Sequence, residues 1–222
     1  MEGAPLPDDP FTALWAAGVF LCCLVILATV NIGSPRKWRV LRQAALRMRM
    51  GTQALREEAD AGDRTVLSLL AVAVAALAML LWQAAVTHGG EAPPSFLYFF
   101  IGTAAVMAVP TVLLRLIALL ARADAGISEY LHTGNLLHAA VGIAILPLVM
   151  LAAYQAPWRA ALILAGLVIL GAGILYRWLR GALIGLSAGV PLRFVLLYLC
   201  AAEIGPLLIA LNSLRNSALL HS

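Results

Sequence analysis

Residues Thr65–Thr87 read TVLSLLAVAVAALAMLLWQAAVT, a stretch that contains no acidic or basic side chain. About 20 apolar residues in a helix cross the hydrocarbon core of a bilayer, so this stretch has the length and composition of a transmembrane helix. In lipid every backbone amide and carbonyl needs a partner within its own element, which favours helices over open strands. The stretch therefore predicts a membrane protein built from α-helices.

The rest of the chain has the same character. Of its 222 residues, 63% are hydrophobic and only 12% are charged. A soluble domain usually carries about 25% charged residues, so this chain has too few to cover a water-facing surface. We predict one integral membrane domain over residues 1–222, an all-α polytopic bundle. The net charge of +4 is interpreted as a topology signal and not as a nucleic-acid footprint.

Six apolar blocks are long enough to cross the membrane. The first has full spanning length and follows a start without Lys or Arg, which is not the pattern of a cleavable secretory signal. A basic, cytoplasmic segment at residues 35–64 separates the first two blocks. The predicted spans are residues 11–32, 65–87, 96–121, 135–155, 160–176 and 191–213.

The distribution of basic residues sets the predicted orientation. Eight of the 15 Lys and Arg residues lie in the segment 35–64, and alternation of the spans brings five more to the same side. Only Arg159 and Arg215 fall on the other side, so the positive-inside rule places both termini outside the cytoplasm. Aromatic residues typical of a membrane interface lie near the predicted outer boundary, namely Trp82, Phe96, Tyr98, Tyr154 and Trp158.

The basic segment also has a helical pattern. Trp38, Leu41, Ala45 and Met48 recur at spacings of three and four with Arg residues between them. This pattern predicts an amphipathic helix lying on an anionic membrane surface, and the alternative is a docking face for a partner protein. The basic residues of this candidate surface are Arg36, Lys37, Arg39, Arg42, Arg47 and Arg49.

Two charged residues inside predicted spans are candidate functional residues. Glu203 lies twelve residues into the last span, about 18 Å along the helix and thus near the bilayer centre. It is interpreted as a proton or cation site or a gating contact, or else as a protonated acid whose hydrogen bond fixes packing. Arg115, near the end of the third span, is either functional or a side chain that reaches to the interface.

Prolines and glycines predict irregular backbone within the bundle. Pro110, Pro147 and Pro206 lie inside spans, where proline removes a backbone hydrogen bond, and broken helices line the cavities of many transporters. The apolar stretch 181–190 has Gly at every fourth position. We predict that it forms a tight turn packed into the bundle, with a re-entrant pore loop as the alternative.

Enzyme signatures are weak in this sequence. A single Glu129-x-x-His132 pair is half of what a di-iron bundle needs, and no phosphate loop or nucleophile elbow is present. Haem bound by His138 is a further alternative. The three cysteines lie in apolar blocks without ligand spacing. We therefore expect no catalytic residue, no metal and no cofactor.

The run Leu197-Tyr-Leu-Cys-Ala-Ala-Glu-Ile-Gly-Pro-Leu207 resembles the closing signature of an uncharacterised bacterial family of small multi-spanning membrane proteins, a domain of unknown function. Tyr130, and the pair Tyr176-Arg177 followed by Gly181, are similar to its second half, so the resemblance covers residues 129–211. The sequence departs from the family pattern at Ala202 and Gly205. The resemblance implies a membrane fold in a bacterial inner membrane, with Tyr198, Glu203 and Pro206 as the family positions.

These observations lead to an expected function. Short loops, a basic docking segment and small-residue packing faces indicate a non-enzymatic accessory or assembly component of an envelope complex. The alternative is a small proton-coupled transporter or permeability protein that uses Glu203, and an intramembrane enzyme is a third reading. The expected partners are the lipid bilayer and a membrane protein, without nucleic acid.

Overall fold

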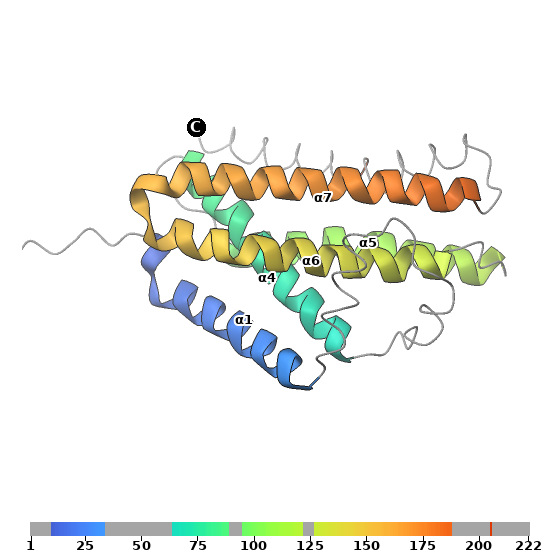
Figure 1. The fold of residues 1–222 in the computed structure, drawn as a ribbon, viewed down its shortest axis with the longest axis horizontal. Helices are drawn as coiled ribbons and strands as arrows, with labels where there is room; N and C mark the ends of the chain where they lie inside the picture. Colours follow the sequence, from blue (N-terminus) through green and yellow to red (C-terminus); the bar gives the residue numbers. More distant parts are fainter. Residues whose placement is uncertain (1–9, 34–63, 89–94, 122–126, 188–204, 206–222) are drawn as a thin grey trace, which may run out of the picture.

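The computed structural model describes residues 10–33, 64–88, 95–121, 127–187 and 205, and all the regular elements in these residues are helical (Figure 1). Five helices are long and apolar enough to cross a membrane, so the predicted all-α membrane-embedded fold is confirmed. They are α1 (Leu14–Gly33), α4 (Arg64–His88), α5 (Phe96–Ala121), α6 (Ile127–Tyr154) and α7 (Arg159–Ser187), with short 3-10 turns η1 (Pro10–Thr12) and η2 (Ala156–Trp158).

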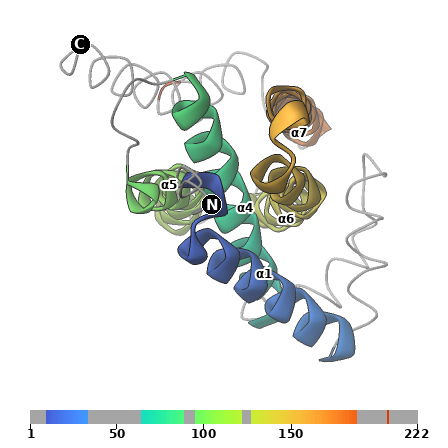
Figure 2. The same ribbon diagram turned by 90° about the vertical axis from the view of Figure 1, so that its left-hand side faces the viewer.

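Helix α4 is the centre of the bundle. It packs against α1, α5, α6 and α7, and its contact with α6 is the most extensive. In the end-on view α4 passes obliquely between α5 on one side and the α6–α7 pair on the other (Figure 2). Apart from the exposed Arg64 at its start, the spanning part of α4 has no charged side chain, so protein can surround it without leaving buried charge unpaired. Its largest fully buried side chains are Met79, Leu80, Gln83 and Val72.

Glycines bring the helices of this centre into close contact. A methyl group added at Gly142 of α6 would overlap the backbone of Ala73 in α4. One added at Gly166 of α7 would lie 2.7 Å from the Cδ1 atom of Leu80. Small residues allow this approach, and in membranes such close packing takes the place of the hydrophobic effect in holding helices together.

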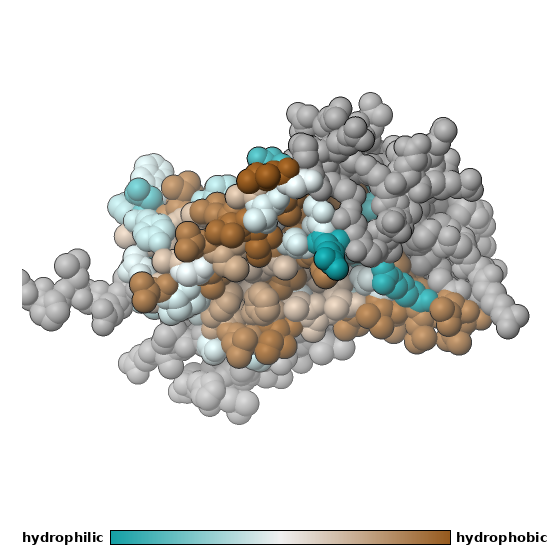
Figure 3. All heavy atoms as spheres, turned by 90° about the horizontal axis from the view of Figure 1, so that it is seen from below, coloured by the Kyte–Doolittle hydropathy of each residue, from teal (hydrophilic) through white to brown (hydrophobic). Residues whose placement is uncertain are grey.

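The outward surface of the bundle is apolar. Large hydrophobic side chains of α5 and α7 are exposed over the length of each helix. On the face seen in Figure 3, apolar residues form most of the described surface and strongly hydrophilic residues occupy only a few positions. Such a surface is stable in lipid and not in water. Examples are Leu97, Ile101, Val112, Leu116 and Leu119 of α5 and Leu164, Val168 and Leu175 of α7.

Aromatic residues gather at the end of the bundle where α4 ends and α5 begins. Trp15 of α1 contacts both Trp82 and Phe96, with ring centroids 5.0 and 5.3 Å apart. Phe11 of η1 also contacts Trp82, with ring centroids 5.5 Å apart. Trp82 is buried here, so it belongs to the core, whereas Tyr154 and Trp158 are exposed in the manner of interfacial residues.

Two helices extend beyond the predicted spans. Helix α6 begins at Ile127 and not at residue 135, and α7 continues to Ser187, well beyond residue 176. Gly181 and Gly185 therefore lie in a helix, and the predicted tight turn is wrong for residues 181–187. A helical glycine costs only about 1 kcal/mol relative to alanine, and the Leu, Ala and Ile residues between these glycines are adequate helix formers.

The predicted proline breaks in the third and fourth spans are also wrong. Pro110 and Pro147 lie inside α5 and α6, which are continuous across them. Proline removes one backbone donor, while the hydrogen bonds of the neighbouring turns remain. Around Pro147 those turns are held by the core, because Ile145 and Val149 are fully buried on either side of it.

The sixth predicted span, residues 191–213, lies outside the described residues apart from residue 205, as does the basic segment up to residue 63. The single-domain organisation and the amphipathic surface helix stay predictions.

Candidate intramembrane polar site

Helices α6 and α7 form an antiparallel hairpin joined by Gln155 and the short turn η2. Residues equally far from this turn therefore lie at the same level. A methyl group added at Gly173 of α7 would be 2.7 Å from the Cγ2 atom of Val141 in α6, which shows the register directly. One turn farther from the connection, the same register brings Arg177 beside His138.

Arg177 and His138 form the principal polar contact between the two helices. The Nη1 atom of Arg177 lies 2.8 Å from Nε2 of the imidazole and 3.4 Å from Nδ1. A donor on the lone-pair axis of Nε2 would be much farther from Nδ1, so the guanidinium lies alongside the ring rather than end-on to it. Arginine commonly makes such stacked contacts, which combine hydrogen bonding with attraction to the π system.

This contact requires a neutral histidine. Arginine is charged at all relevant pH values, and a second cation at hydrogen-bond distance inside a bundle would be strongly repelled. The ring also has the backbone of Gly134, one helical turn earlier, as a hydrogen-bond partner. A neutral imidazole can donate to that backbone from one nitrogen, while the guanidinium of Arg177 lies alongside the ring.

Further polar groups surround this pair at the same end of the hairpin. Arg180, one turn beyond Arg177, is 4% exposed, and Thr133 of α6 is 1% exposed. The hydroxyl of Tyr176 is buried and has no hydrogen-bond partner among the described residues. Arg177 also packs across Gly134, with its Nε atom 3.9 Å from the position of an added methyl group. We call His138, Arg177 and Arg180 the basic cluster.

The basic cluster brings two arginines to one end of the α6–α7 hairpin. Helix α7 contains no acidic residue, and the one acidic residue of α6, Glu129, lies in its first turn. Charges that are partly shielded from water act over longer distances than fully exposed ones, and guanidinium groups bind anions. Chemically, the guanidinium groups of the cluster can bind and orient an anionic group.

A separate polar contact lies deep in the core. Gln83 of α4 is fully buried, and its Nε2 atom donates to the carbonyl oxygen of Val149 at 3.1 Å. Its Oε1 atom has no partner among the described residues. The residue links α4 to α6 near the end of the bundle opposite the basic cluster.

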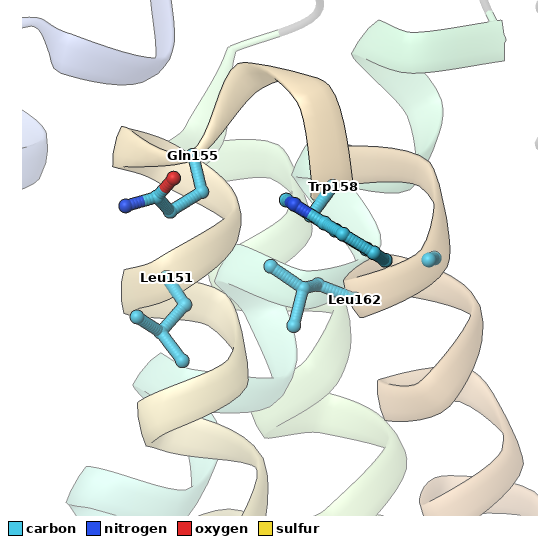
Figure 4. Close-up of a pocket in the computed structure, with 5 residues that line it drawn as sticks. Leu151, Gln155, Trp158 and Leu162 are labelled. Carbon is cyan, nitrogen blue, oxygen red and sulfur yellow. The ribbon is translucent and has the colours of Figure 1, made fainter.

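A shallow hollow of about 430 Å³ lies at the α6–α7 connection (Figure 4). It is lined by Leu151, Gln155, Trp158, Ala161 and Leu162. The walls are mainly apolar, and neither Gln83 nor the basic cluster borders it. It is a surface feature rather than an access route to the polar groups.

The structure places only one of the predicted site residues. Arg115 is exposed on α5, and both interpretations of this residue stay predictions. Tyr198, Glu203 and Pro206 lie outside the described residues, as do the six basic residues of the predicted membrane-surface helix, Arg36, Lys37, Arg39, Arg42, Arg47 and Arg49.

Sequence reasoning missed the pairing of His138 with Arg177, because it treated the arginine as a topology signal and the histidine as a haem alternative. A usable signal was present. In a hairpin with a short connection, partners lie at equal distances from the turn, and the midpoint of positions 138 and 177 falls in η2. Using it required knowing that the two spans are direct neighbours.

The chain resembles one protein family over most of its length. Residues 16–214 match the family described as Domain of unknown function (DUF4271), a wider range than the resemblance in residues 129–211 indicated. No curated protein and no solved structure matches the chain. Because the match spans well over half of the sequence, the protein belongs to this domain-of-unknown-function family.

Proposed function

We propose that this protein is a non-enzymatic accessory or assembly component of a bacterial inner-membrane complex. The observation that carries the proposal is the seam between α4 and α6, where Gly142 lies directly against the backbone of Ala73. Helices in such close contact cannot slide or separate without losing the packing that holds them. A rigid bundle suits a scaffold better than a machine that alternates between open and closed forms.

The outer face of α5 is the surface through which we propose that the protein contacts its partner. Ile101, Val112 and Leu116 are exposed there and lie near one face of the helix. Helix α5 is also less buried in the bundle than α4 or α6. Transmembrane helices bind one another through such faces by van der Waals packing.

The test is affinity purification of the tagged full-length chain from native membranes in a mild detergent, followed by quantitative mass spectrometry. One tryptophan is then introduced at a time at Ile101, Val112 and Leu116. A bulky ring is tolerated where a side chain faces lipid, and it blocks close packing where the side chain faces a partner. We expect at least one position to reduce recovery of a specific membrane protein about tenfold while the level of the tagged chain is unchanged.

The matched control is Leu67→Trp, which adds the same bulk at an exposed position of α4 near the end of the bundle. This control is expected to leave co-purification intact. The proposal would be contradicted if no membrane protein reproducibly co-purified with the tagged chain. It would also be contradicted if none of the three α5 substitutions changed the recovery of the co-purifying protein.

A second candidate is a small transporter for an anion or for an anion with protons. It is favoured by the buried Arg180, since charged residues within spans often mark substrate pathways. Glu203 would be the proton-coupling residue under this reading. In proteoliposomes, Glu203→Gln should then reduce flux at least tenfold and change its pH dependence. Identical flux and pH dependence in wild type and variant would eliminate this candidate.

A further inference from the structure

The basic cluster lies at a membrane interface. Trp158 is 67% exposed at one end of α7, and Trp178 lies twenty residues farther along the chain. Twenty helical residues rise about 30 Å, which is the thickness of the hydrocarbon core. Interfacial tryptophans prefer the two boundaries of that core. Arg177 and Arg180 flank Trp178, so their guanidinium groups lie at the depth of lipid headgroups.

The length of α6 agrees with this placement. Helices α6 and α7 contain 28 and 29 residues, about 42 Å each, and so extend beyond the hydrocarbon core. If the exposed Tyr154 marks one boundary of the core, the other falls near Gly134, about 30 Å along the helix. Both helices of the hairpin therefore cross into the headgroup layer at the level of the basic cluster.

We propose that the basic cluster is a binding site for the phosphate of an anionic phospholipid headgroup. Arg177 is partly exposed and is held in place by His138, so its guanidinium is oriented before a ligand binds. The guanidinium fork matches a phosphate in shape and charge. Arg180, buried one turn farther along, adds a second positive charge with little screening from water.

Neutral His138 has a positioning role in this site. It fixes Arg177 through the ring contact without adding a third charge, and it is itself fixed by the backbone of Gly134. Basic pockets between transmembrane helices at the headgroup level are a known way of holding anionic lipids. This inference does not depend on the proposed accessory role, because a scaffold or a transporter could equally carry a bound lipid.

The experiment uses Trp178 as the reporter. A chain that retains this tryptophan alone, with Trp15, Trp38, Trp82 and Trp158 changed to Phe, is reconstituted in vesicles of phosphatidylcholine and phosphatidylglycerol. Either lipid is brominated in turn, since bromine quenches a nearby tryptophan. We expect brominated phosphatidylglycerol to quench at least about fivefold more effectively at equal mole fraction, as one basic residue near a membrane surface predicts. In Arg177→Gln/Arg180→Gln the two lipids should quench equally.

Arg115→Gln is the matched control. Arg115 is exposed on α5, nineteen residues from Phe96, and so lies near the same membrane boundary. The preference for phosphatidylglycerol should survive this substitution. Equal quenching by both lipids in the wild type would overturn the proposal, and so would an equal loss of preference in Arg115→Gln. Loss of the preference in potassium phosphate, but not in potassium chloride of the same ionic strength, would assign the site to soluble phosphate instead.

A second measurement covers the case in which the double glutamine variant does not fold. Arg177→Lys keeps the charge but lacks the planar fork. Adding phosphatidylglycerol to the detergent-solubilised protein should raise its melting temperature in the wild type and in Arg115→Gln, and at most half as much in Arg177→Lys. Equal shifts in all three proteins would contradict a specific phosphate site.

Discussion

The guanidinium of Arg159 lies over the ring of Phe11, with Cζ 3.9 Å from the ring centroid. The Nε atom of the same arginine donates to the carbonyl oxygen of Ala152 at 3.1 Å. One side chain at the start of α7 thus connects η1 with the last turn of α6. This contact accounts for one of the two basic residues that the charge distribution places on the non-cytoplasmic side.

Breaking this contact should destabilise the end of the bundle. We expect Arg159→Gln and Phe11→Leu each to lower the free energy of unfolding, with a coupling of about 0.5–1 kcal/mol, because a cation–π contact at a partly exposed site has that strength. A double-mutant cycle in detergent measures the coupling. Strictly additive effects of the two substitutions would show that the two side chains do not interact.

Gly142→Ala should destabilise the protein by about 1–3 kcal/mol. Its added methyl group overlaps the backbone of Ala73, and overpacking of a tight seam has a cost of that order. Gly171→Ala is the control, because an added methyl group there has nothing within 4 Å and alanine favours the helix. Thermal unfolding compares the two. The argument for a close seam fails if both alanine variants are equally stable.

Replacing His138 tests the charge balance of the basic cluster. His138→Lys puts a second cation beside Arg177, a repulsion of about 4 kcal/mol for charges 4 Å apart at an effective dielectric constant of 20. We expect this variant to unfold at lower temperature than His138→Glu, which can pair with Arg177. Adding Arg177→Glu to His138→Lys should restore stability. If the lysine and glutamate variants have the same melting temperature, residue 138 does not face the guanidinium.

Gln83→Leu should change the free energy of unfolding by less than about 1 kcal/mol. The substitution loses the hydrogen bond to Val149 but also removes a buried oxygen without a partner among the described residues. Gln83→Ala should cost more, since it leaves a cavity. Chemical unfolding in mixed micelles measures both. A leucine variant much less stable than the alanine variant would show that the amide oxygen has a strong partner.

The membrane fold was predictable because it follows from local composition. A chain that crosses lipid as helices needs long apolar stretches, and a block such as Thr65–Thr87 fits only a membrane-spanning helix. The ends of α6 and α7 were not predictable in the same way. Polar residues such as His132 and Asn135 are unfavourable in a helix that faces lipid. They nevertheless lie in the first part of α6, where this helix packs against neighbouring helices.

The candidate site was less accessible to prediction because it depends on which helices are neighbours. Glu203 was conspicuous as a carboxylate in an apolar run, but the contact that the described residues reveal joins a histidine and an arginine 39 positions apart. Each of these two looks ordinary alone. Only the pairing of α6 with α7 brings them together, and that pairing is a tertiary property.

The central place of α4 has a consequence for biogenesis. A ribosome delivers α4 to the membrane before α6 and α7 exist, so α4 resides for a time as a nearly solitary span. Its apolar sequence is stable in lipid during that interval. Gln83 can form its hydrogen bond to the carbonyl of Val149, 66 positions downstream, only after α6 has been inserted. Helix α7, which contains Arg159, Arg177 and Arg180, is synthesised after α6, so His138 is already in the membrane when its partner Arg177 enters.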